Sequence, residues 1–365
     1  MQLVCSACKN SYKANRLFIC PDCGSILTVN YSYGTINGKK FIDQRQSKIW
    51  RFWRLFPFEH FPRNFITLGE GDTPLLRARV LGKEFGITNL YLKNEGENPT
   101  GSFKDRSIAV GFNKALQEGA KKVMVYSSGN AAVSLASFAH KARIQAKVFI
   151  ESTNKTAIDR CRNLGVKVIG VPDEKTFLRD LRLLFFLFFK NWENAWQKEF
   201  LSFFENEFRN GWYPIQPNII VNPYQIEGIK TISYEICEQL KWDAPDVVIS
   251  AGITGDLFLG QWRGYKDLYH LKLIRHLPRM ILIARKKKHP FSIFNSLVLK
   301  VIRDSGGEIV YTTEEENKEA MKLIFNKENI ETETISASVI AGLRRVKQNL
   351  KTNSKIICIL SGNNV

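Results

Sequence analysis

From Thr67 onward, short runs rich in β-branched residues alternate with helix-like segments, and this alternation restricts the fold more than any other feature. Helical patterns such as "AVSLASFAHKA" and "IEGIKTISYEICEQL" lie between the runs. Strand, loop and helix in this order predict an α/β protein with mostly parallel sheets, in which ligands bind at loops after the carboxyl ends of strands. The expected buried strands are residues 121–126, 146–150, 166–171, 246–250, 279–284 and 355–360.

Two of the loops that follow expected strands are rich in small residues. They read "SSGNAA" (127–132) and "SAGITGD" (250–256), and the second precedes a helical pattern. Glycine in such a loop lets backbone N–H groups approach an anion at a helix N-terminus. Because strand-to-helix turns commonly contain glycine, each loop alone is weak evidence for an anion site.

The length of 365 residues predicts two domains and leaves room for a small additional module. The sequence contains no run of about 20 apolar residues and its first residues do not resemble a signal peptide, so we expect a cytoplasmic protein without membrane contact. The net charge of +18 is compatible with a nucleic-acid partner. Its basic residues are spread along the chain, with one compact cluster at 285–289, so nucleic-acid binding is not the favoured interpretation.

Four of the seven cysteines form two C-x-x-C pairs near the N-terminus. Two such pairs supply four thiolates for one tetrahedral zinc ion, and a complete set leaves no open position for catalysis. We therefore expect a structural zinc-ribbon-like module over residues 1–30, with reduced, unmetallated pairs as the alternative. The expected ligands are Cys5, Cys8, Cys20 and Cys23.

The segment "ENPTGSFKDR" (97–106) places one lysine, Lys104, between turn-forming residues and a helical pattern. A lysine amine in such a place becomes a useful nucleophile when it forms a Schiff base with an aldehyde, and pyridoxal 5'-phosphate supplies one. The site would also need partners for the cofactor's phosphate, ring nitrogen and ring hydroxyl. The chain offers candidates in "SSGN", "SAGITGD" and the terminal "LSGN".

These motifs resemble those of the threonine synthase family, within the second fold type of pyridoxal-phosphate-dependent enzymes. The resemblance extends over nearly the whole chain and includes "LGEGDTPLL" (68–76), "LYLKNEGENPTGSFKDR" (90–106) and "VNPYQIEGIKTISYEICEQL" (221–240). It implies a two-domain fold similar to the tryptophan synthase β subunit, with a large cofactor-binding domain (31–104 plus 214–365) and a small α/β domain (105–172). A homodimer is expected.

Residues 173–213 would form an aromatic-rich helical insertion within this plan. Charges of both signs are mixed on its polar face, so we expect it to pack on a neighbouring domain or a second subunit rather than on a membrane. The polar stretch 32–48 is interpreted as a linker or extended arm.

The resemblance also implies a role for each matching residue. Lys104 would carry the cofactor on its amine and then act as the general acid–base. Asn130 would contact the ring hydroxyl and Ser361 the ring nitrogen, although ordinary capping or turn chemistry would also explain either residue. The other expected contacts are with the cofactor phosphate, through Gly252, Thr254 and Gly255, and with the amino-acid substrate, through Ser127, Ser128 and Gln225.

Some residues depart from the family pattern. Asp256 puts a carboxylate near the expected cofactor phosphate, which should weaken cofactor binding unless a cation compensates. Where the family holds the phosphate of O-phosphohomoserine, a buried dianion would lack charge-assisted donors in this chain. The residues there are Ala131, Ile219, Ile220 and Gln225. They favour a different best substrate, unless other basic residues of the chain take over.

The expected function is a lyase reaction: elimination or replacement at the β or γ carbon of an amino acid, with pyridoxal phosphate as cofactor. Threonine synthase activity, which converts O-phosphohomoserine to threonine, is the leading specific candidate. A paralogue similar to cysteate synthase or to a serine/threonine dehydratase is one alternative. The other is a non-catalytic zinc-ribbon protein that binds nucleic acid or a protein partner, in line with the +18 charge and the altered phosphate loop.

Overall fold

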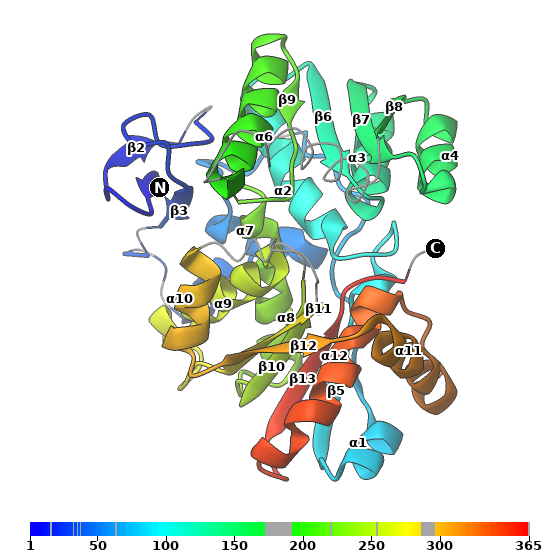
Figure 1. Cartoon of the computed structure of the whole chain (residues 1–365). Helices are drawn as coiled ribbons and strands as arrows, with labels where there is room; N and C mark the ends of the chain where they lie inside the picture. The colour runs from blue at the N-terminus through cyan, green and yellow to red at the C-terminus, as the bar shows by residue number, and fades with distance from the viewer. Residues whose placement is uncertain are drawn as a thin grey trace. The chain divides into compact units, whose positions relative to one another are not determined.

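The computed structural model of the chain (Figure 1) describes residues 1–14, 17–31, 33–34, 36, 38–62, 64–171, 192–219, 221–252, 255–285 and 296–363. They form two units whose segments interleave along the sequence. The first unit contains Met1–Ser32, Phe56–Leu68 and Ser107–Gln225, and the second contains Tyr33–Leu55, Gly69–Arg106 and Ile226–Val365. The expected domain division differs in detail, since it places boundaries after residues 30, 104, 172 and 213.

The second unit is built on a six-stranded sheet that is parallel except for its edge strand β4. In sheet order the strands are β12 (Glu308–Thr312), β11 (Arg279–Arg285), β10 (Val247–Ala251), β13 (Lys355–Leu360), β5 (Asn89–Asn94) and β4 (Leu75–Arg77). Every residue of β10 is buried, as is typical of a parallel strand that is covered on both faces.

Helices pack on this sheet through alternate residues of its strands. α1 (Arg79–Phe85), α11 (Glu314–Glu328) and α12 (Thr334–Val346) share one apolar core with residues such as Ile249 and Ile283. α9 (Asp256–His270) contacts β10 and β11, and α8 (Thr231–Gln239) packs on α9. The other helical segments of this unit are α7 (Ile226–Ile229), α10 (Ser296–Asp304) and the 3-10 helices η1 (Gly38–Phe41), η2 (Lys48–Leu55), η3 (Glu95–Glu97) and η4 (Lys347–Asn349).

The first unit contains two sheets. One is parallel, with the order β8 (Lys167–Val171), β7 (Gln145–Glu151), β6 (Lys122–Ser127) and β9 (Tyr213–Pro214). Its helices are α3 (Asn130–Ala142), α4 (Lys155–Asn163), α6 (Trp192–Arg209) and most of α2 (Lys104–Gln117), which begins in the second unit. The other sheet is antiparallel and lies near the N-terminus, with β1 (Gln2–Cys5) between β2 (Ser11–Lys13) and β3 (Leu27–Asn30).

The α/β prediction with mostly parallel sheets is confirmed, because all six expected strands are present and pair in parallel. The helix expected over "IEGIKTISYEICEQL" is divided into α7 and α8 at Lys230. The linker interpretation of residues 32–48 is wrong for its last part: Phe41 of η1 is fully buried and its ring stacks on Phe52.

Part of the aromatic insertion is described, as α6. Its Phe204 is buried in a cluster with Met124 and Phe149, so this helix packs on the parallel sheet of its own unit. Residues 172–191, with the expected aromatic face, lie outside the described residues, as does most of the basic cluster at 285–289. No helix in the described ranges combines the length and the apolar composition needed to cross a membrane.

Candidate active site

Three neighbouring strands of the second unit end at one edge of the sheet, and each is followed by a segment that was singled out from the sequence. Gly252 follows β10, Ser361 follows β13, and the segment that leads to Lys104 follows β5. Leu360 of β13 pairs with Asn94 of β5, so these two strands end side by side. Because carboxyl ends of parallel strands are the usual ligand-binding edge of an α/β sheet, this is the candidate active site of the unit.

Lys104 is fixed by backbone pairing with the end of the chain. Ser102 and Gly362 form an antiparallel bridge. The Phe103 N–H donates to the carbonyl of Ser361 at 3.0 Å, and the Asn363 N–H donates to Gly101 O at 3.0 Å. Lys104 is therefore brought together with Ser361, although 256 positions separate them in the sequence.

The Lys104 amine has an unusual electrostatic environment. The residue is half-buried, and its Nζ lies 4.5 Å from the centre of the Phe103 ring. Burial of the amine lowers the pKa of Lys104, and the carboxylates of Asp256 and Glu333 only partly oppose that shift. A lysine with a lowered pKa carries a larger neutral fraction and is a better nucleophile.

Glu333 is a site residue that the sequence analysis missed. Its side chain is 9% exposed at the start of α12, and the Ser361 Oγ donates to its Oε1 at 3.5 Å. The Glu333 N–H donates in turn to the carbonyl of Gly362 at 3.0 Å. The only signal for it in the sequence is an acidic residue just before a helical pattern, which is too common to indicate a site.

The loop between β10 and α9 is shaped by two glycines. Gly255 has φ of +80°, and a Cβ at this position would lie 2.6 Å from Cγ2 of Val298. A Cβ on Gly252 would lie 3.6 Å from the backbone nitrogen of Gly255, which is an ordinary van der Waals distance. The positive φ of Gly255 suits the turn from β10 into α9, and the N-terminus of a helix is a place where backbone amides can hold an anion. Thr254, expected to assist them, lies outside the described residues.

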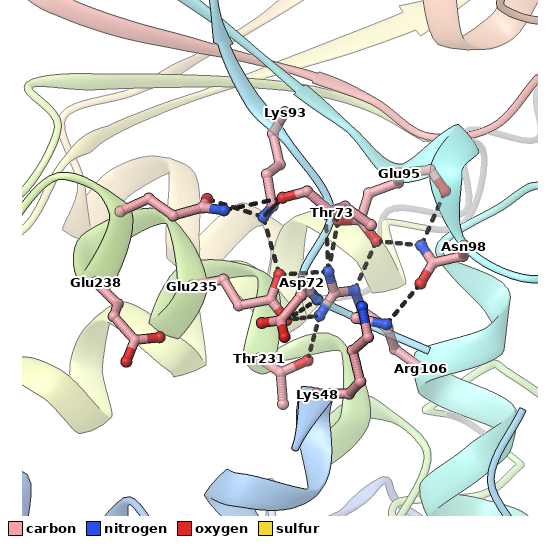
Figure 2. A network of polar contacts seen from close by, with 12 residues as sticks. Lys48, Asp72, Thr73, Lys93, Glu95, Asn98, Arg106, Thr231, Glu235 and Glu238 are labelled. Carbon is pink, nitrogen blue, oxygen red and sulfur yellow. Dashed lines mark hydrogen bonds and ion pairs between the residues drawn. The ribbon is translucent and has the colours of Figure 1, made fainter. Parts of the chain in front are cut away.

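A buried ion-pair network (Figure 2) anchors the first turn of α2. This helix begins at Lys104. Arg106 is fully buried and is the centre of the network. Its guanidinium donates to Glu95 Oε2 at 2.6 Å and to Glu235 Oε1 at 2.6 Å, and Lys93 Nζ reaches Glu235 Oε2 at 2.9 Å. Two cations and two carboxylates balance in charge, so the network fixes α2 to β5 and α8 without a net buried charge.

The remaining expected ligand-binding residues belong to the first unit. Ser127 ends β6 and is half-buried, Ser128 is exposed, and Asn130 begins α3. The Ser127 Oγ accepts a hydrogen bond from the Gly129 N–H at 3.0 Å, which shapes the turn. Gln225 is 1% exposed at the end of the unit. The expected site residues are therefore divided, with Lys104, Gly252, Gly255 and Ser361 in the second unit.

The four N-terminal cysteines converge in the small antiparallel sheet. Their sulfur atoms all lie within 4.8 Å of one another. The Sγ atoms of Cys5 and Cys23 are 3.5 Å apart, and those of Cys8 and Cys20 are 3.7 Å apart. A tetrahedral zinc ion with bonds of about 2.3 Å requires sulfur–sulfur distances of about 3.8 Å, so the donor set fits zinc.

The other three cysteines, expected to be buried fillers, are indeed buried. They are Cys161, Cys237 and Cys358.

Comparisons with known proteins agree with this geometry. The family model described as "Pyridoxal-phosphate dependent enzyme" matches residues 66–362. A threonine synthase of Methanocaldococcus jannaschii is 31% identical, over 98% of this chain and 91% of the relative. Another, of Halalkalibacterium halodurans, is 32% identical, over 82% of this chain and 83% of the relative. The solved structure of maize serine racemase has the same fold, with a TM-score of 0.62 at 20% identity over 80% of this chain and 88% of that one. The chain belongs to the threonine synthase family of pyridoxal-phosphate-dependent enzymes.

Proposed function

We propose that this enzyme catalyses elimination or replacement at the β or γ carbon of an amino acid, and that conversion of O-phosphohomoserine to threonine is the leading specific reaction. The observation that carries the proposal is the amine of Lys104, which has a lowered pKa and is fixed beside Ser361 at the ligand-binding edge of the sheet. Relatives that are named threonine synthase and match the chain over most of its length support the specific reaction.

The residues present fit pyridoxal phosphate. A bound cofactor of this kind withdraws electrons from the substrate's α carbon, which makes its proton removable. Lys104 would hold the cofactor and then take that proton at its Nζ. Backbone amides at the start of α9, in the loop that contains Gly252 and Gly255, would hold the phosphate. Ser361 would contact the ring nitrogen and Asn130 the ring hydroxyl, while Thr254 remains an expected phosphate contact.

Asp256 is 4% exposed in the first turn of α9, close enough to Lys104 to oppose the lowering of its pKa. An amine that must lose its proton to react does not compensate this carboxylate, so the expectation that Asp256 weakens binding of the cofactor phosphate stands as part of the proposal.

Gln225 is the best-supported candidate for contact with the substrate. Its Oε1 accepts from Ser107 Oγ at 3.3 Å. Its Nε2 is buried and has no hydrogen-bond partner among the described residues. A buried amide donor without a partner costs about 1–3 kcal/mol. An acceptor atom on a bound substrate would remove that cost, which supports Gln225 as a substrate contact. Ser127 and Ser128 are proposed as further substrate contacts.

A second candidate function is the same chemistry on an amino acid that carries no phosphate. Ala131 is 3% exposed and Ile219 is 1% exposed, and neither can donate a charged hydrogen bond. Ile220 lies outside the described residues. With Gln225 as a neutral donor, this group suits a hydroxyl or another uncharged leaving group better than a phosphate dianion.

We also propose that Cys5, Cys8, Cys20 and Cys23 hold a structural zinc ion, because their sulfur distances match a tetrahedral site. Four thiolate ligands leave no coordination position for a substrate. Dimer formation stays a proposal on the resemblance alone.

Phosphate release separates the two candidate functions. For the purified enzyme reconstituted with pyridoxal phosphate, we expect saturable release of phosphate from O-phosphohomoserine, together with formation of threonine. Parallel assays with O-phosphoserine, serine and homoserine, and a Lys104→Ala blank, control for other amino acids and for contaminating phosphatases. Turnover of serine or homoserine without release from millimolar O-phosphohomoserine would establish the second candidate and exclude the first.

A further inference from the structure

The core of the four-cysteine sheet is completed by a residue from far along the chain. Its own buried members are Leu3, Cys5, Cys20, Leu27 and Val29, and the sixth member of the cluster is Tyr224, which is 0% exposed. Cys5 and Cys20 are thus both expected metal ligands and members of the same buried cluster as this aromatic ring. A change at the metal site is therefore expected to disturb the cluster in which Tyr224 packs.

Tyr224 is also fixed from its other sides. Nζ of Lys114, on α2, lies 5.2 Å from the centre of its ring. The Tyr224 N–H donates to Asn222 Oδ1 at 3.0 Å, and Asn222 Nδ2 donates to the carbonyl of Pro214 at 2.8 Å. The backbone that leads into Gln225 is thus held between the cysteine sheet, α2 and β9.

The next residue, Gln225, has little freedom of its own. A Cβ on Gly111 would lie 2.6 Å from Cγ and 3.0 Å from Nε2 of Gln225, so this side chain rests directly on the α2 backbone. Ser107 fixes its Oε1. The Nε2 donor has no partner within the part of the chain that the structure describes. Its direction is therefore set by the backbone at 224–225, and a shift of Tyr224 would turn it away.

We propose that zinc bound by the four cysteines controls the affinity for the amino-acid substrate, with Tyr224 as the positioning residue and Gln225 as the donor that responds. The inference rests on the proposed function of Gln225. A sheet with so few apolar core residues depends on its metal for stability. Loss of zinc would open this core, release the Tyr224 ring and misplace Gln225.

If zinc acts on Gln225 through Tyr224, its removal should affect the binding of one ligand and not of the other. Tyr224, Gln225 and the cysteines all belong to the first unit, whereas Lys104, Gly252 and Ser361 belong to the second. Zinc removal should therefore weaken binding of the amino acid while pyridoxal phosphate stays attached. A metal that merely stabilised the whole protein would affect both.

The test uses the full-length holoenzyme and the double variant Cys8→Ser/Cys23→Ser. Cys8 and Cys23 are the exposed ligands, so their replacement removes the metal without cutting into the core. Three quantities are measured separately. They are the zinc content, the visible band of bound pyridoxal phosphate, and the shift of that band on titration with O-phosphohomoserine or L-serine. We expect the variant to lack zinc, keep the band and bind the amino acid at least about tenfold more weakly, the size of one lost hydrogen bond.

Two variants of Tyr224 and one of Gln225 test whether the effect of zinc passes through these residues. Tyr224→Phe should keep the normal affinity, and Tyr224→Leu should bind zinc but show the weak affinity of the zinc-free enzyme. In a Gln225→Ala background, zinc removal should cause no further loss. Zinc chelation of the wild type gives the same comparison without any substitution.

Different results would overturn this inference and the proposed function. Unchanged affinity without zinc, in an enzyme that Gln225→Ala still weakens, would overturn the inference alone, as would loss of the cofactor band together with the zinc. Normal affinity in Gln225→Ala would overturn the proposed substrate contact of Gln225, and no binding of either amino acid by the wild type would count against the proposed function; this inference falls in both cases.

Discussion

Replacement of Lys104 by alanine is expected to remove the visible absorption band of the bound cofactor and to lower turnover by about 10²–10⁴-fold or more. The amine lies at the first position of α2 and burial lowers its pKa, and its removal takes away both the proposed bond to the cofactor and the group proposed to transfer the proton. The measurement is the absorption spectrum of the purified variant after incubation with pyridoxal phosphate, followed by the turnover assay.

Lys104→Arg is the matched control for charge. It keeps a cation beside Asp256 and Glu333 but has no amine that can react, so it should lose the band as well. Borohydride reduction of the wild type followed by peptide mapping should place the cofactor on the peptide that contains Lys104. A label on Lys93, the buried lysine of β5, together with a normal band in Lys104→Ala, would contradict the assignment.

The parallel sheets were predictable because a buried strand needs little more than a run of β-branched and apolar residues. β10 and β13 show this apolar pattern clearly. Gly252 and Ser361 follow them directly, at the edge of the sheet where the candidate active site lies. β12, with the sequence "EIVYT", was not among the expected strands, because polar residues interrupt its pattern. The role expected of Lys104 came from its local motif together with the resemblance of several motifs to the family, and it stays a proposal.

Contacts between distant segments were not predictable from such patterns. Glu333 reaches Ser361 only because the end of the chain folds back on α12. Tyr224 is part of a family motif, yet no feature of that motif indicates that its ring completes the core of the cysteine sheet. The burial of Phe41 was not predicted for the same reason, since a single phenylalanine in a polar stretch carries no sign of burial.

Replacement of Glu235 by alanine is expected to destabilise the protein by about 3–5 kcal/mol, because it leaves buried cations without their partner. Glu235 accepts from Arg106 Nη1 at 2.6 Å, from Arg106 Nη2 at 2.7 Å and from Lys93 Nζ at 2.9 Å. After its removal, Glu95 alone would face two buried positive charges. Chemical denaturation of the wild type and the variant measures the difference.

Glu238→Ala is the control, one turn further along α8. The side chain of Glu238 is 34% exposed and pairs with Arg51, so its loss should cost no more than about 1 kcal/mol. The network also positions Lys104, two residues before Arg106 in α2. Glu235→Gln keeps the shape of the side chain and removes its charge, so it should fold better than the alanine variant. Equal losses for Glu235→Ala and Glu238→Ala would show that the buried pairing is not what stabilises α2.

The pH dependence of stability gives an independent measure of the same network. Burial disfavours the charged form of Glu235, but Arg106 and Lys93 outweigh it and hold the pKa of this carboxyl well below its usual value. A group whose pKa is lower in the folded than in the unfolded state stabilises the fold at pH above its unfolded value of about 4.3, and that contribution is lost as the pH falls further. The free energy of unfolding of the wild type should therefore decrease from about pH 5 downward. Glu235→Gln cannot titrate at this position, so its curve should fall less steeply over the same range, and parallel curves would place the acid sensitivity elsewhere.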